Sequence, residues 1–250
     1  MSEPSSNTTP QDDRYEIPNY LVADLSKVLT KVAANEGWYR QSWLGVPIWQ
    51  LPDDLMLLQR IVTAIRPALI VETGTKYGGS ALFFASLLEL LDLHESRVIT
   101  VDICETEEAR TLLANHRLAG YVQHRLVASS LDPQVLACIT AAVAAAPGPV
   151  LVFLDDWHGG EHVLAELQAY APFVGADGLL VVADTSFADL AGTPVAPFRS
   201  LLHSNPRTAI NSFLKASPAF ERTTDFVVGG LSNFADGVLR RSHQKQAQRF

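Results

Sequence analysis

A glycine-rich turn with an acid in front of it is the sharpest chemical feature of the sequence. The segment Val71–Ser80 reads VETGTKYGGS and lies between an expected strand and an expected helix. Gly74 permits a tight turn, while Gly78 and Gly79 let a ligand approach the backbone amides at a helix start. A dinucleotide site needs the spacing G-x-G-x-x-G, which is not present here. The acid Glu72 repels a pyrophosphate and favours a ligand that carries an amino group and a sulfonium.

The ends of the next two expected strands carry side chains that can extend such a site. Asp102 ends the second strand, where a carboxylate can accept both ribose hydroxyl hydrogens. The alternative is an exposed aspartate that caps the following helix. Ser129 and Ser130 follow the third strand and can either reach an adenine edge or cap the helix that begins near Asp132. The sequence leaves both alternatives open.

Carboxylates and histidines gather after the fourth and fifth expected strands. Asp155 can bind a cation or a substrate, and His158, with an ordinary pKa near 6.5, suits general-base work at neutral pH. For His162 we expect a role in packing or helix capping. Asp184 ends the fifth strand, so Asp155 and Asp184 together predict a site for a hard cation. Asp156 is a weaker candidate ligand, because adjacent strand residues point to opposite faces.

Alternating apolar segments must position these residues. We expect strands at 68–72, 97–101, 121–128, 150–154 and 178–183, with helices between them at 79–91, 105–118, 132–145 and 161–171. Nearly continuous apolar strands separated by helices indicate a parallel sheet covered on both faces. The last quarter predicts a helix at 208–214 and strands at 220–223 and 226–239, the second interrupted by Gly229-Gly230. This ending is typical of a terminal antiparallel hairpin.

The chain predicts one domain with short tails. We expect a flexible tail at 1–14, a single domain at 15–241 and a C-terminal tail at 242–250. Within the domain, 15–66 forms a helical and aromatic cap, with helices at 18–34 and 52–66. Its aromatic segment from Trp38 to Trp49 either covers a pocket or packs the N-terminal helix on the sheet. That segment and the proline-bearing loop at 193–206 are our candidates for a substrate lid.

Composition excludes several classes of protein. The chain has 250 residues, a net charge of −8 and a hydrophobic share of 48%, which suits one α/β domain with a substantial core. Nucleic-acid binding needs clustered Lys and Arg and is not expected. Two cysteines, Cys104 and Cys138, make no disulfide framework, and no segment has the pattern of a signal peptide or a membrane span. We therefore expect a cytoplasmic protein without a membrane partner.

Several motifs in order resemble the cephalosporin-hydroxylase family. They are the turn Val71–Ser80, Asp155 with His158 and His162, Asp184-Thr185, the helix segment Val163–Pro172, Asn205–Leu214 and Phe234–Leu239. The similarity runs from about Trp43 to Arg241. Despite the name, members of that family are class I S-adenosylmethionine (SAM)-dependent methyltransferases of antibiotic and sugar-modifying pathways.

The resemblance implies a fold and a set of site residues. The fold would be the Rossmann-like class I methyltransferase fold, with a mostly parallel seven-stranded sheet, a C-terminal antiparallel hairpin and helices on both faces. SAM would lie on Glu72, Gly74, Thr75, Tyr77, Gly78, Ser80, Asp102, Ser129 and Asp155. The family associates Asp155 and the acids after the fifth strand with magnesium. Ala183 stands where the family usually has Glu, which puts Mg²⁺ in doubt here.

The expected reaction is transfer of the SAM methyl group to a hydroxyl on a small natural product or a sugar. His158 or Asp155 would remove or orient the proton of that hydroxyl, and relatives lead us to expect a homo-oligomer. One alternative is a catalytically silent SAM-binding scaffold, because Ala183 removes a ligand. Another is a non-haem iron hydroxylase, which uses two histidines and a carboxylate. Its usual His-x-Asp or His-x-Glu element occurs at none of the seven histidines.

Overall fold

The structure is a computed structural model that describes residues 24–25, 27–28, 31, 40–191, 196–228 and 231–242. Both predicted tails, apart from residue 242, lie outside the described residues. So do Trp38 and most of the expected helix at 18–34, of which the described positions are helical.

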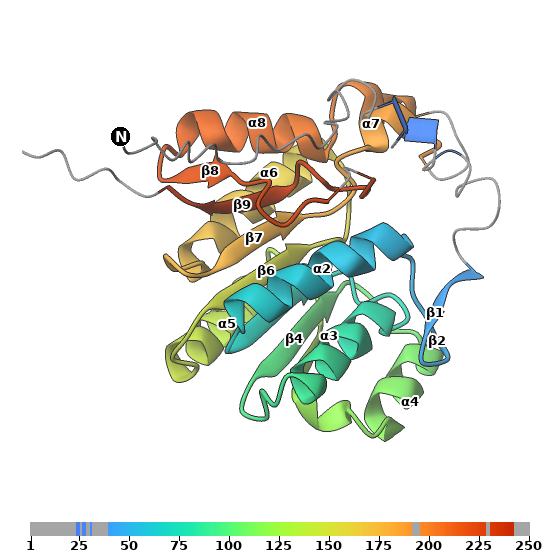
Figure 1. Ribbon diagram of the computed structural model, residues 1–250, viewed down its shortest axis with the longest axis vertical. Helices are drawn as coiled ribbons and strands as arrows, with labels where there is room; N and C mark the ends of the chain where they lie inside the picture. The colour runs from blue at the N-terminus through green and yellow to red at the C-terminus, as the bar shows by residue number, and fades with distance from the viewer. Residues whose placement is uncertain are drawn as a thin grey trace, which may run out of the picture.

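A seven-stranded sheet forms the centre of the molecule (Figure 1). Its strands, in the order β5-β4-β3-β6-β7-β9-β8, are β5 (Val122–Val127), β4 (Arg97–Asp102), β3 (Leu69–Thr73), β6 (Val150–Leu154), β7 (Leu179–Val182), β9 (Val238–Arg241) and β8 (Phe220–Arg222). The first five are parallel, and β9 pairs antiparallel with both β7 and β8. The chain therefore runs outward from β3 to β5 and returns to β6, which puts the switch in strand order between β3 and β6.

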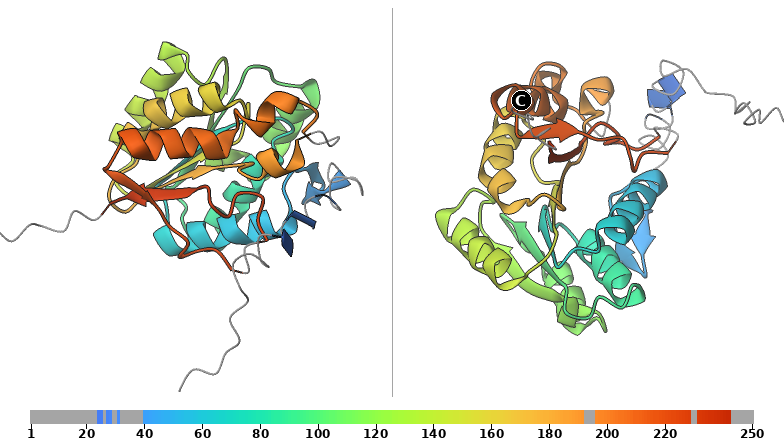
Figure 2. Two further views of the ribbon diagram at one scale, coloured as in Figure 1. Left: turned by 90° about the horizontal axis from the view of Figure 1, so that it is seen from above. Right: turned by 60° about the vertical axis from the view of Figure 1, so that its left-hand side comes forward.

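Helices cover both faces of the sheet (Figure 2). One layer contains α2 (Pro52–Ile65), α3 (Gly79–Leu90) and α4 (Glu107–Asn115), and the other contains α5 (Pro133–Ala145), α6 (Gly160–Tyr170) and α8 (Pro206–Ala216). The buried strand residues divide between the two layers in alternation. In β3, Ile70 packs toward α2 and α3, whereas Leu69 and Val71 pack toward α5 and α6. The predicted doubly covered sheet is confirmed.

The C-terminal part confirms the hairpin but corrects its second strand. We expected a strand over 226–239, whereas the described part of that segment consists of turns and bends until β9 begins at Val238. Hydrogen bonds to a buried aspartate explain why this segment does not form a strand. Asp54 of α2 accepts hydrogen bonds from the Ser232 hydroxyl (2.7 Å) and the Asn233 amide (2.7 Å), which takes these residues out of any strand ladder.

A small hairpin precedes α2. Strands β1 (Ser42–Trp43) and β2 (Val46–Pro47) pair antiparallel around Leu44 and Gly45, both of which have positive φ angles of 50° and 88°. Two residues with positive φ are the requirement of a tight type I′ hairpin turn. The sequence did not predict this hairpin. Among the described residues, no helix is long and apolar enough to cross a membrane.

Candidate active site

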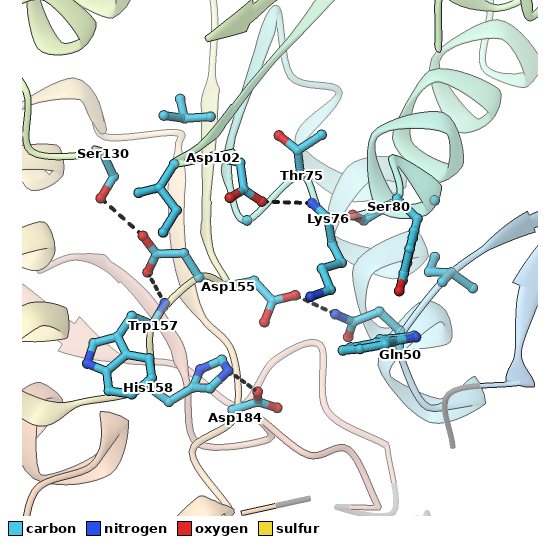
Figure 3. Close-up of a pocket in the computed structure, with 18 of the residues that line it drawn as sticks. Gln50, Thr75, Lys76, Ser80, Asp102, Ser130, Asp155, Trp157, His158 and Asp184 are labelled. Atoms are coloured by element: carbon cyan, nitrogen blue, oxygen red, sulfur yellow. Dashed lines mark hydrogen bonds and ion pairs between the residues drawn. The ribbon is translucent and has the colours of Figure 1, made fainter. Parts of the chain in front are cut away.

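A cavity of about 380 Å³ opens at the carboxyl ends of the parallel strands, at the switch point between β3 and β6. The turn after β3, the end of β4, the loop after β6 and the segment after β2 form its wall. Figure 3 shows Asp102, Asp155 and Asp184 facing this space from three strand ends. Ligands of open α/β sheets bind at this position, so the cavity is the candidate site.

Gly74 allows the two central loops to approach each other. Its φ angle is +91°, and a Cβ added here would lie 2.1 Å from the backbone oxygen of Asp155. The backbone also links the loops, because the Asp155 amide donates to the Thr73 oxygen at 3.1 Å. Glycine at this position therefore sets the distance between the turn after β3 and the catalytic candidates after β6.

Glu72 lies beneath the cavity wall and is fully buried. The Thr100 hydroxyl donates to its Oε2 at 2.7 Å, while its Oε1 has no hydrogen-bond partner. Burial raises the pKa of Glu72 to about 7. Hydrogen bonds from Ser80 and Thr100 lower this pKa, but their effect is smaller than that of burial. A buried carboxylate oxygen without a donor is costly, so Glu72 is suited to receive a donor or a positive charge from a ligand.

Asp102 lies at the cavity wall and does not cap the following helix. Its carboxylate accepts the Lys76 amide at 2.9 Å, whereas Thr106 caps α4. Ile103 beside it is 76% exposed and lines the same cavity, which leaves an apolar side chain available to an aromatic ring. The alternative role of Asp102 as a helix cap is therefore wrong.

Ser129 and Ser130 both line the cavity. Neither caps α5, since the Asp132 carboxylate accepts the Gln134 amide at 2.7 Å and is the N-cap. The Ser130 hydroxyl donates to Asp156 at 3.1 Å, and the Ser129 hydroxyl accepts the Leu131 amide at 3.3 Å. The capping alternative is wrong for both serines.

Asp155 is held by a residue that the sequence did not single out. The Gln50 side-chain amide donates to Asp155 Oδ2 at 2.6 Å, and Figure 3 shows this bond crossing the cavity. Burial raises the pKa of Asp155 well above its usual range, and the charges of Asp184 and Glu72 raise it further. Several carboxyl groups therefore crowd around Asp155, and a cationic ligand would balance their negative charge.

His158 and Asp184 form a close pair beside Asp155. His158 Nε2 lies 3.0 Å from Asp184 Oδ2, and Asp184 Oδ1 accepts the Asn233 side-chain amide. Burial lowers the pKa of His158 to about 4 and raises that of Asp184 to about 7. Burial therefore makes this imidazole a weaker base than the histidine of ordinary pKa assumed from the sequence. Asp184 has a φ of 55°, an unusual backbone conformation for a non-glycine residue that Asn233 helps to hold.

The donor atoms of Asp155, His158 and Asp184 all lie within 4.8 Å of one another, so the three can share one cation. Their two carboxylates and one imidazole are a donor set that divalent metals accept. Ala183 is 1% exposed and packs in the apolar core, so it supplies no ligand. These residues fit a divalent cation, with His158 in addition to the two aspartates.

Asp156 turns away from that group. Its carboxylate contacts the Ser130 hydroxyl, the Trp157 amide and His162, whose Nε2 is 3.1 Å from both Asp156 oxygens. His162 therefore pairs with an acid at the cavity wall. It does not cap α6, whose N-cap is Gly159.

One end of the aromatic segment lines the cavity, whereas Trp43 packs against α3; packing against the expected helix at 18–34 concerns residues that lie largely outside the described ranges. The ring of Trp43 packs against Phe83 with centroids 5.0 Å apart, and its indole nitrogen donates to Ser86 at 3.0 Å. Trp49 instead lines the cavity, with its ring 5.5 Å from that of Tyr77. Lys76 Nζ lies 4.8 Å from the Trp49 ring centroid. Trp43 therefore packs in the core, and Trp49 forms part of the cavity wall.

Most predicted site residues meet at this cavity. It is lined by Gly74, Thr75, Tyr77, Ser80, Asp102, Ser129, Asp155, His158 and Asp184. Glu72 and Gly78 are buried behind the wall, where a Cβ on Gly78 would lie 2.8 Å from the Leu113 side chain. Gln50 and Ile103 were missed, although their position next to predicted motifs was the available signal, whereas Trp49 belongs to the segment expected to cover a pocket.

Three features define the class I methyltransferase fold. They are the cavity at the β3–β6 switch point, the antiparallel strand β9 next to the sheet edge, and the helices on both faces. The chain belongs to the family described as Rhamnosyl O-methyltransferase/CmcI, which matches residues 35–242. This match confirms the predicted relationship to a methyltransferase family. The name cephalosporin hydroxylase, given to that family from the sequence motifs, stays untested.

Relatives and solved structures agree with this assignment. The chain is 31% identical over 160 residues to the Rhamnosyl O-methyltransferase of Mycobacterium bovis (strain BCG / Pasteur 1173P2), an alignment that spans 64% of this chain and 62% of that relative. It is 28% identical over 181 residues to the protein of the same name from Mycobacterium leprae (strain TN), covering 72% and 73% of the two chains. A CmcI structure described as Mg-SAM superposes with a TM-score of 0.60 at 14% identity, covering 94% of this chain and 89% of that one.

Proposed function

We propose that this protein is a SAM-dependent methyltransferase that methylates a hydroxyl group of a sugar or another small natural product. The observation that carries the proposal is the acidic cavity at the β3–β6 switch point, in a chain of the Rhamnosyl O-methyltransferase/CmcI family. Its walls suit a ligand with a positive charge at one end and a nucleoside at the other.

Each part of SAM has a partner among the described residues. Asp102 would accept the ribose hydroxyls, with Ile103 and Ser129 near the adenine. Ser80 at the cavity wall would receive the methionine end, and the carboxyl group of Glu72, buried behind that wall, would favour the amino group through its charge. When bound, SAM supplies an electrophilic methyl group on its sulfonium. The buried carboxylate of Asp155 would stabilise that positive charge.

The acceptor hydroxyl would lie against Asp155, His158 and Asp184. Burial lowers the pKa of His158 to about 4, which weakens it as a base, and Asp184 at 3.0 Å would offset this by stabilising the imidazolium that forms when His158 takes the hydroxyl proton. In a metal-loaded site the same three residues would instead be ligands: the cation would orient the hydroxyl and offset the clustered carboxylates, and His158 would not be the base.

Calorimetry with S-adenosylhomocysteine (SAH), followed by a methylation assay on a rhamnoside, tests the proposal. We expect SAH to bind, and His158→Ala and Asp155→Asn to lose activity by about 10²–10⁴-fold, the usual contribution of a general base. His124→Ala is the control, because His124 lies half-buried on β5 outside the cavity wall.

Failure to bind SAH at millimolar concentration would overturn the proposal. SAH binding without turnover on rhamnosides and a panel of other small hydroxyl acceptors would favour the silent scaffold instead.

A further inference from the structure

A second group of ligand-type side chains lies between the end of β6 and α6. Asp156 follows Asp155 in sequence, but its carboxylate points to α6, where His162 and Glu166 stand one helical turn apart on one face. His162 Nε2 is 3.1 Å from Asp156 Oδ2 and 3.6 Å from Glu166 Oε2. The donor atoms of the three residues all lie within 4.8 Å of one another.

Glu166 is the unusual member of this group. It is 0% exposed, and neither of its carboxylate oxygens makes a hydrogen bond of good geometry. Burial raises the pKa of Glu166 well above its usual range, and the charge of Asp156 adds to this effect. Two carboxylates that face one imidazole in a buried setting need either a shared proton or a cation to balance them.

We propose that Asp156, His162 and Glu166 form a binding site for a divalent transition metal ion of the zinc class, separate from the group of Asp155, His158 and Asp184. The spacing fits, because ligands about 2.1 Å from a tetrahedral metal lie about 3.4 Å from one another. Imidazole nitrogen with two carboxylates favours zinc-type ions over Mg²⁺, which prefers oxygen ligands only.

The surroundings supply access and outer support. Asp156 and His162 line the main cavity, and His162 also borders a second cavity of about 320 Å³ beside Trp157 and Phe198. A fourth ligand position can therefore be filled by water. The Ser130 hydroxyl donates to Asp156 at 3.1 Å, and the Tyr170 hydroxyl donates to the Ser130 carbonyl at 2.8 Å. Such outer contacts hold ligands in place.

A metal here would tie the loop after β6 to α6. That loop carries Asp155 and His158, so the ion would fix their positions without touching the acceptor. The inference goes beyond the proposed function and does not depend on it, since it rests on Asp156, His162 and Glu166 alone.

Metal titration of the full-length protein tests the inference. The parent for the test is the metal-stripped Asp184→Asn protein, in which the first group has lost a ligand. We expect it to bind one Co²⁺ per chain, seen as visible absorption, and Zn²⁺ to compete for the site and raise the melting temperature. Adding Glu166→Gln should weaken binding by more than about 100-fold, because losing even an outer partner costs about 10–100-fold. Glu161→Gln, an exposed acid on the same helix, is the matched control and should leave the affinity unchanged.

Two results would overturn the inference. One is no Co²⁺ or Zn²⁺ binding by the Asp184→Asn protein, and the other is equal affinity with and without Glu166→Gln. If Glu166→Gln raises the melting temperature and leaves metal affinity unchanged, the group shares a proton and is no metal site. Should Glu166→Gln fail to fold by circular dichroism, Asp156→Asn decides between the same outcomes. SAH calorimetry on each variant reports separately on the proposed function.

Discussion

Gly74→Ala separates backbone strain from steric clash at the centre of the site. An alanine at φ +91° carries the left-handed penalty of about 1–2 kcal/mol. Its Cβ would also lie 2.1 Å from the Asp155 oxygen and 2.7 Å from the Asp155 carbonyl carbon, both backbone atoms that cannot rotate away. Relief of such overpacking costs a further 1–3 kcal/mol or so. We expect Gly74→Ala to lower the free energy of unfolding by about 2–5 kcal/mol.

Gly45→Ala provides the matched control. Gly45 has nearly the same φ, +88°, and nothing lies within 4 Å of an added Cβ, so this variant carries the strain alone. At about 2–4 °C per kcal/mol for a chain of this size, thermal melting should resolve the two variants. Gly74→Ala should also bind SAH about tenfold or more weakly, because Asp155 is displaced. Equal melting temperatures for the two variants would refute the reasoning, as would unchanged SAH affinity in Gly74→Ala.

Two other substitutions test separate parts of the argument. Asp102→Asn should weaken SAH binding by about 10- to 100-fold in calorimetry, since it removes a charged acceptor worth about 1.5–3 kcal/mol; unchanged affinity would remove Asp102 from the site. Burial raises the pKa of Asp54 to about 7, so its contribution to stability is present below pH 4 or so and is lost as the pH rises through about 7. Urea unfolding between pH 5 and pH 8 should therefore show a smaller loss of stability for Asp54→Asn than for the wild type. The exposed neighbour Asp53→Asn should behave as the wild type, and parallel pH profiles for all three proteins would contradict this account.

The sheet was predictable because its central strands β3, β4, β6 and β7 are buried on both faces. Continuous apolar runs such as Val150–Leu154 can be read directly, and the intervening helices require parallel pairing. The segment before β9 was not predictable, since Ser232 and Asn233 are bound by Asp54, 178 and 179 residues away in the chain. Its apolar residues resemble a strand, and only the tertiary contact shows why it is a loop.

The same division applies to the site. Acids at strand ends were predictable, because parallel strands bring their carboxyl ends to one edge. Gln50 was not, since its bond to Asp155 joins residues 105 positions apart. The hydrogen bond of Asn233 to Asp184 likewise follows from folding of the C-terminal segment across the sheet edge. Most residues that line the cavity could be predicted from motifs, whereas those that hold them in place could not.

The charge of the site argues for a cationic ligand independently of any family. The charges of Asp184, Glu72 and Asp54 all raise the pKa of the buried Asp155, and the charge of Asp184 also raises the pKa of Asp54. Such a group is unfavourable in the absence of a ligand, because each carboxylate has lost its water. A sulfonium and a divalent cation would supply the missing positive charge, whereas a pyrophosphate would add to the repulsion. Binding of SAM or of a divalent cation should therefore add little stability at low pH, where the acids are protonated, and should stabilise the fold most above pH 7 or so. SAH, which lacks the sulfonium, should show a weaker dependence on pH than SAM.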